Sequence, residues 1–144
     1  MFERFFENKK RLAIIAGCSS FGSNIASLLS SYNFEVIVLD KDKNAFYKLQ
    51  DSFSGLTVTA DATDTSILEE NNIKKASIFI ATTGNDNQNS LLCQIAAKVY
   101  DVKNVYAHMQ EVLNENILMQ NNIHIINPAA LCVSEFERQT SLAG

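Results

Sequence analysis

Short apolar runs alternate with amphipathic segments along almost the whole chain. The apolar runs are rich in Ile and Val and are bounded by polar residues, which is typical of strands buried on both faces of a sheet. In the first intervening segment, Phe21, Ile25 and Leu28 recur with the period of a helix. The sequence predicts strands at residues 12–16, 35–39, 56–60, 77–81, 104–108 and 123–126, shorter helices at 43–52, 64–72 and 111–121, and a last helix after Pro128.

Strict alternation of strands and helices predicts parallel strands joined by right-handed crossovers. We therefore expect an α/β fold: a Rossmann-like, doubly wound six-stranded parallel sheet in the order 3-2-1-4-5-6, within a three-layer αβα sandwich. The 144 residues suit a single domain, and one proline and five glycines leave no obvious linker. We assign residues 11–144 to this domain and residues 1–10 to an N-terminal extension.

The composition excludes several classes of protein. With 47% hydrophobic and 19% charged residues, the chain is too apolar to be disordered. A net charge of −4 disfavours nucleic acid as the main partner. No run approaches the ~20 apolar residues of a membrane-spanning helix, and the first residues lack the apolar core of a signal peptide. Cys18, Cys93 and Cys132 show no metal-ligand spacing and suit small core positions in a reducing cytoplasm, so we expect no metal site and no direct membrane insertion.

The turn after the first strand, "AGCSSFG", has the spacing of a phosphate-binding turn. A side chain at Gly17 would obstruct the tight turn, and Gly22 lies where the helix must approach the sheet. Ser19 replaces the usual second glycine, but its hydroxyl can donate to a phosphate oxygen. Unpaired amides and the helix dipole favour an anion at the start of the helix. The expected phosphate-binding residues are Gly17, Cys18, Ser19, Ser20, Phe21 and Gly22.

Asp40 ends the second expected strand, next to this turn. A carboxylate there can accept both hydroxyls of an adenosine ribose and would repel a 2′-phosphate, which favours NAD or an adenine nucleotide over NADP. The alternative is a turn or capping role, although Asp42 is the better cap. Lys41 is either a contact to the ribose or adenine or an ordinary surface lysine.

Two more strand ends should open on the same side, because parallel strands direct their carboxyl ends to one edge of the sheet. After the third strand, in "ADATD", Asp61 is placed to accept a hydrogen bond from an adenine amino group, and Ala62 offers backbone contacts. After the fourth strand, "ATTGND" would flank the pyrophosphate, and Asn85 or Asp86 would cap the next helix. The alternative for both segments is an ordinary strand-to-helix turn. The candidates in the second segment are Thr82, Thr83, Gly84 and Asn85.

Together, "GCSSFG", "LDKD", "TADATD" and "ATTGNDNQN" resemble the N-terminal domain of the RCK family, the regulators of potassium conductance in Trk and Ktr uptake systems and in ligand-gated potassium channels. The resemblance spans nearly the whole chain. It implies that the domain binds NAD(H) or an adenine nucleotide (ATP, ADP or AMP) as an effector and catalyses no reaction. The glycine turn would then hold the phosphates, Asp40 the ribose, and Asp61 with Ala62 the adenine.

The resemblance also implies partners and a location. Members form homodimers that assemble into a ring beneath a membrane potassium transporter or channel subunit, so this chain would be cytoplasmic and reach the membrane through that partner. Four features depart from the family pattern. Ser19 replaces a glycine, Ser20 replaces a frequent arginine, His108 replaces a frequent arginine or lysine, and the smaller C-terminal domain has no counterpart before Gly144. The loss of the arginine puts selectivity for a triphosphate in doubt.

Two other functions remain open from the residues alone. A small NAD-dependent oxidoreductase domain would need a proton donor, and His108, at the end of the fifth strand, is the candidate; a polar rim residue is the alternative. His124 lies in a short apolar strand and is expected at a core or edge position. No paired carboxylates or Ser–His–Asp arrangement stand out, which favours binding without catalysis. The other possibility is an interaction module that binds no nucleotide.

The two ends of the chain predict a dimer. The last helix has an apolar stripe of Leu131, Cys132 and Phe136, and the N-terminus carries three phenylalanines. These residues offer more apolar surface than one face of a sheet needs. The alternative is that they pack within one chain. The N-terminal residues concerned are Phe2, Phe5 and Phe6.

Overall fold

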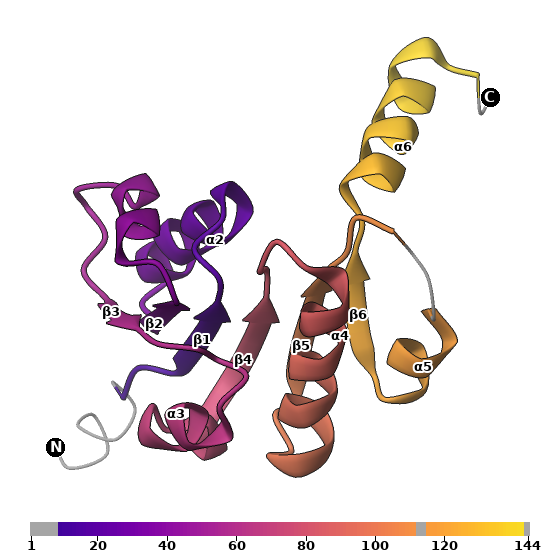
Figure 1. Cartoon of the computed structure of the whole chain (residues 1–144). Coiled ribbons are helices and arrows are strands. Elements are labelled where there is room, and N and C mark those ends of the chain that lie inside the picture. Colours follow the sequence, from indigo (N-terminus) through magenta and orange to yellow (C-terminus); the bar gives the residue numbers. More distant parts are fainter. Residues whose placement is uncertain (1–8, 112–114, 143–144) are drawn as a thin grey trace, which may run out of the picture.

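A computed structural model describes residues 9–111 and 115–142 of the chain. The chain forms a six-stranded sheet in the order β3-β2-β1-β4-β5-β6, and every neighbouring pair of strands is parallel (Figure 1). This topology confirms the predicted doubly wound, Rossmann-like α/β fold. The strands are β1 (Leu12–Ala16), β2 (Glu35–Asp40), β3 (Leu56–Thr59), β4 (Ala76–Ala81), β5 (Asn104–His108) and β6 (Ile123–Ile126).

The helices follow the predicted order, with two differences in type. The segment expected at 43–52 is a short 3₁₀ helix that ends at Lys48, and α4 passes into a π-helical turn. Asp42 caps the 3₁₀ helix by accepting from the Asn44 amide, as its position predicts. The helices are α2 (Ser20–Ser31), η1 (Lys43–Lys48), α3 (Thr65–Glu70), η2 (Ile73–Lys75), α4 (Asp86–Gln94), η3 (Ile95–Val99), α5 (Glu115–Gln120) and α6 (Pro128–Thr140).

Alternate residues of the central strands feed two separate cores. In β1, Ile15 belongs to the core that α2 and η1 cover on one face of the sheet. Ile14 belongs to the larger core on the other face, to which α3, α4 and α5 contribute. β1 is therefore buried on both faces, as its continuous apolar run predicts. Edge strand β3 is mostly exposed instead, and Leu56 lies largely in solvent. The expected three layers are present.

One half of a sheet face has little helical cover. On the side of α2 and η1, Ile78 and Tyr106 are only half-buried, and His124 on β6 is exposed and stacks on Tyr106. The next helix in the chain, α6, has no buried residue and extends away from the sheet (Figure 1). An apolar helix and an apolar part of the sheet therefore both lack a partner within the described chain.

Three further expectations concern Cys132, the N-terminal phenylalanines and membrane-spanning helices. Cys132 is exposed on α6, so its expected place in the core is wrong, because α6 does not pack on the sheet. Phe2, Phe5 and Phe6 lie outside the described residues. None of the described helices combines the length and the hydrophobicity that are needed to cross a bilayer.

Candidate functional site

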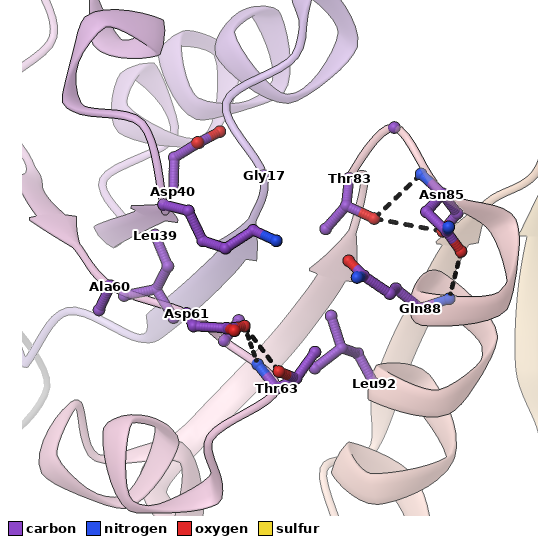
Figure 2. Close-up of a pocket in the computed structure, with 13 residues that line it drawn as sticks. Gly17, Leu39, Asp40, Ala60, Asp61, Thr63, Thr83, Asn85, Gln88 and Leu92 are labelled. Carbon is purple, nitrogen blue, oxygen red and sulfur yellow. Dashed lines mark hydrogen bonds between the residues drawn. The ribbon is translucent and has the colours of Figure 1, made fainter.

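A hollow of about 280 Å³ lies at the carboxyl ends of β1 to β4. In Figure 2, Asp40 and Asp61 lie on one side of it, and Thr83, Asn85 and Gln88 lie on the other. This edge is where an open α/β sheet binds ligands, at the point where the strand order reverses between β1 and β4. The lining residues are Gly17, Leu39, Asp40, Lys41, Ala60, Asp61, Ala62, Thr63, Thr83, Gly84, Asn85, Gln88 and Leu92.

The glycine turn is held against the end of β4 by close backbone contact. Gly17 has a φ of +106°, and a Cβ added there would lie 2.4 Å from the carbonyl oxygen of Thr82. A Cβ at Gly22 would lie 2.5 Å from the carbonyl oxygen of Gly17. Only glycine fits at either position, as predicted for a tight turn at Gly17 and a close approach at Gly22.

The first turn of α2 presents free backbone donors at this edge. Ser19 caps the helix, and its hydroxyl accepts from the Gly22 amide at 3.0 Å. The amides of Ser19, Ser20 and Phe21 have no hydrogen-bond partner among the described residues. These donors and the positive end of the helix dipole make the α2 N-terminus suitable for an anion such as a phosphate.

The Asp40 carboxylate joins the second strand end to the glycine turn. Its Oδ2 accepts from the Cys18 amide at 2.8 Å, and its Oδ1 accepts from the Asp42 amide at 2.8 Å. A carboxylate has about four acceptor positions, so these two bonds leave room for further donors such as ribose hydroxyls. Lys48, which the sequence did not single out, donates from Nζ to the Cys18 carbonyl at 3.2 Å. The second strand end and the glycine turn are thus held in a fixed relation.

One wall of the hollow is acidic. Asp61 accepts from both the amide and the hydroxyl of Thr63, at 2.9 and 2.7 Å. Both hydrogen bonds lower the pKa of Asp61, and the bond from the Thr63 hydroxyl has the larger effect. Asp61 is therefore a carboxylate at neutral pH. With Asp40 on the same wall and only Lys41 as a lining cation, this end suits a neutral base and sugar better than a phosphate.

A buried amide supports the other side of the hollow. The Asn89 side chain accepts from the amide and hydroxyl of Thr83 and donates to the carbonyls of Thr83 and His108. It therefore joins the ends of β4 and β5, and it is buried. Asn85 caps α4 by accepting from the Gln88 amide, as predicted for one of two candidates. The other candidate, Asp86, binds two amides of the loop after β5 instead.

A chain of hydrogen bonds runs from the glycine turn to the end of β5. The Ser19 and Thr82 hydroxyls lie 2.7 Å apart, and the Thr82 hydroxyl lies 2.9 Å from Nδ1 of His108. The Phe21 ring stacks on the His108 ring at 4.7 Å between centroids. Burial lowers the pKa of His108, and the nearby Asp86 carboxylate opposes this effect. His108 thus has a structural role that its position in the sequence does not reveal.

The structure divides the expected site residues into two sets. The first set lines the hollow: Gly17, Asp40, Lys41, Asp61, Ala62, Thr83, Gly84 and Asn85. The second set forms the α2 N-terminus and its support, outside the lining: Cys18, Ser19, Ser20, Phe21, Gly22 and Thr82. Thr82 is fully buried beneath the turn.

Other residues of the site were missed at the sequence level. Gln88 lines the hollow one turn into α4, and Thr63 follows Asp61 by two residues. For Asn89 a signal existed, because this polar residue lies one helical turn before Leu92 and Cys93, on the same side of the helix. A buried asparagine on the apolar side of a helix indicates a hydrogen-bonding role.

The arrangement favours binding of a ligand with a neutral end and an anionic end. The hollow would hold the neutral end, and the α2 N-terminus would hold the anion. Among residues 9–111 and 115–142, no group of three or more His, Cys, Asp or Glu residues is placed to hold a metal ion.

Comparisons with known proteins identify the family of this chain. The family model of the TrkA-N domain matches residues 13–128. "Trk system potassium uptake protein TrkA" of Streptomyces coelicolor is 34% identical over 98 residues, which make up 68% of this chain and 44% of that protein. The chain thus spans less than half the length of this relative.

Solved structures share the fold at low sequence identity. The NAD(P)-binding domain of an exopolyphosphatase-related protein from Archaeoglobus fulgidus has a TM-score of 0.73 at 19% identity, covering 90% of this chain and 96% of that one. The Kef CTD of Shewanella denitrificans, in an AMP-bound form, has a TM-score of 0.68 at 18% identity, covering 93% and 82%. The family match runs from β1 to the start of α6, and the chain therefore belongs to the TrkA-N family of RCK N-terminal domains.

Proposed function

We propose that residues 11–144 form a nucleotide-sensing regulatory domain of a potassium uptake system or channel, which binds an adenine nucleotide without catalysing a reaction. The observation that carries this proposal is the hollow between Asp40, Asp61 and Thr83, which lies beside the free amides of the α2 N-terminus. The base and ribose would occupy the hollow, with Asp40 accepting from the ribose hydroxyls. The phosphates would bind the amides of the first turn of α2.

The candidates for the ligand are NAD(H), ATP, ADP and AMP. The name of the Streptomyces coelicolor relative supports a role in potassium uptake, and the AMP-bound form of the Kef CTD supports a ligand with an AMP moiety. The partner would be a membrane potassium transporter or channel subunit, and the domain would lie in the cytoplasm and reach the membrane through it. Nucleotide occupancy would favour one arrangement of the assembly, and that difference in affinity would bias the pore.

A homodimer or larger ring would complete the surface of the domain. The exposed apolar residues of α6 and the half-covered face of β4, β5 and β6 are complementary in character. Both would be buried if α6 of one copy packed on the sheet of another. Copies of the chain could therefore associate through these surfaces without any change in the fold of each copy.

Calorimetric titration with AMP tests the nucleotide site. We expect wild-type protein to bind with a Kd below about 1 mM, and we expect Asp40→Ala to weaken binding at least about tenfold because the ribose loses its acceptor. Asp64→Ala is the matched control. Like Asp40, Asp64 is a carboxylate that accepts from the amide two residues later, that of Ser66, but it caps α3 and does not line the hollow. Parallel titrations with ADP, ATP, NAD and NADH complete the test. Failure of wild-type protein to bind any of these nucleotides, or equal affinity in Asp40→Ala, contradicts the proposal.

A further inference from the structure

Two aromatic rings stack beside the start of α2, on the side of β5. Phe21, on the first turn of α2, stacks on His108 at the end of β5 with 18° between the ring planes. His108 is also bonded through Thr82 to Ser19, the residue that caps α2. Three separate parts of the chain are thereby fastened together: the glycine turn, the end of β4 and the end of β5.

The order of the strands fixes the direction in which a bound nucleotide would run. A base and ribose in the hollow lie at β2 and β3, and the phosphates then lie at β1 and α2. Any group attached beyond the phosphates continues toward β4 and β5, because the other direction is filled by the adenosine. The stacked Phe21–His108 pair lies between α2 and β5, in the path of that group.

The volume of the hollow fits the adenosine that AMP, ADP and NAD have in common, so selection among them depends on what lies beyond it. About 280 Å³ is near the lower end of the range for small-molecule sites and suits one nucleoside. A second hollow of about 400 Å³ begins at Gly84 and Asn85 and extends over the first turn of α4 to the loop after β5. Asp86 and Glu111 line it, so its electrostatic potential disfavours further phosphate groups, such as the third phosphate of ATP, and does not oppose an uncharged or cationic nucleoside.

We propose that the site selects a nucleotide that ends at its phosphates, AMP or ADP, and that the stacked Phe21–His108 pair excludes a dinucleotide. This inference rests on the proposed nucleotide site and narrows its ligand. Phe21 and His108 would act as specificity-determining residues: a dinucleotide must separate the two rings and break the bond from Thr82 to His108 before its second nucleoside can enter.

The test is calorimetric titration of wild-type protein with AMP, ADP and NAD at one pH and salt concentration. NAD is expected to bind at least tenfold more weakly than ADP, which carries the same adenosine diphosphate group. In His108→Ala and in Phe21→Ala, the ratio of NAD to ADP affinity is expected to rise at least fivefold. His124→Ala is the matched control, because His124 is also a stacked histidine, on Tyr106 at 4.9 Å, on the neighbouring strand.

Each outcome decides the inference. If NAD binds to wild-type protein as tightly as ADP, the proposed exclusion of dinucleotides is wrong, whereas the proposed nucleotide site stands. This also holds if the second nucleoside of NAD enters the hollow at Asp86. A ratio that rises equally in His124→Ala would also overturn the exclusion, because the effect would then be general. If AMP, ADP and NAD all fail to bind, and ATP also fails, the proposed function itself fails. The wild-type ratio stands even if a variant does not fold, which thermal melting would reveal.

Discussion

At the residue scale, the close contact between Gly17 and Thr82 makes the most direct prediction about stability. We expect Gly17→Ala to lower the free energy of unfolding by about 3 kcal/mol, because the new Cβ meets a backbone carbonyl at 2.4 Å and the residue has a φ of +106°. Urea unfolding of the variant and of wild-type protein measures this difference.

Gly84 provides the control within the same site. A Cβ at Gly84 meets nothing within 4 Å, so Gly84→Ala is expected to change the free energy of unfolding by no more than about 0.5 kcal/mol. Equal losses in the two variants would mean that the turn at Gly17 is more adaptable than its contacts indicate.

The same scale shows what the sequence can predict about the site. The positions of Gly17, Gly22 and Asp40 at this edge of the sheet were predictable, because they follow from local chain geometry at the end of a strand. The contacts of Phe21 with His108 and of Ser19 with Thr82 join residues far apart in the sequence. Spacing carries no information about such pairs, and they became visible only when the strand order brought the two ends together.

At the scale of the element, α6 differs from the other long helices described, α2 and α4, because none of its residues is buried. Leu131 is 60% exposed and Phe136 is 61% exposed. We expect Leu131→Ser combined with Phe136→Ser to convert an associated protein to monomers at tens of micromolar, because the replaced side chains contact little within one chain. Light scattering measures the mass, and the melting temperature of the monomeric fold should change little.

An exposed leucine on α2 provides the control for the α6 variant. Leu28 on α2 is 49% exposed, and Leu28→Ser removes an exposed apolar side chain from a helix that already packs on the sheet. This variant should keep the mass of the wild-type assembly. If wild-type protein is itself a monomer at this concentration, α6 does not mediate association of copies.

The elements also differ in how well their types could be predicted. β1 and β2 were predicted to within one residue because long apolar runs dominate their sequences. The segment after β2 was expected to be a longer helix, but the described helix is 3₁₀ and ends at Lys48. Its apolar residues Ala45 and Phe46 pack on the core that lies on the same side of the sheet as α2. Their spacing is also allowed in an α-helix, so periodicity could not distinguish an α-helix from a 3₁₀ helix here.

At the scale of the whole molecule, burial of His108 links global stability to pH. Its pKa in the folded state lies below the ordinary value of 6.5, so the unfolded chain binds the proton more readily. Stability is therefore fully present above pH 6.5 and decreases as the pH falls from 6.5 toward the folded-state pKa. We expect His108→Gln to remove this part of the pH dependence, as measured by urea unfolding between about pH 7.5 and pH 5.

The Asp61 carboxylate titrates in a separate window. Its folded-state pKa is lowered below 3.8, so its contribution is present above that value and decreases only in stronger acid. A change confined to the range below pH 4 therefore does not report on His108. Identical slopes for wild-type protein and His108→Gln between pH 7.5 and pH 5 would show that burial of this ring has no energetic effect.

The hydrogen bonds that run from Ser19 through Thr82 to His108 can be donated in either direction. When Nδ1 of His108 carries no hydrogen, Thr82 donates to the ring and Ser19 donates to Thr82, so every hydrogen points away from the turn. When Nδ1 is protonated, Thr82 accepts from the ring and donates to Ser19, and the order reverses. The Ser19 hydroxyl is then available to donate a hydrogen bond to any acceptor that binds at the start of α2. One proton on a distant strand thus decides whether the helix cap offers a donor to its surroundings.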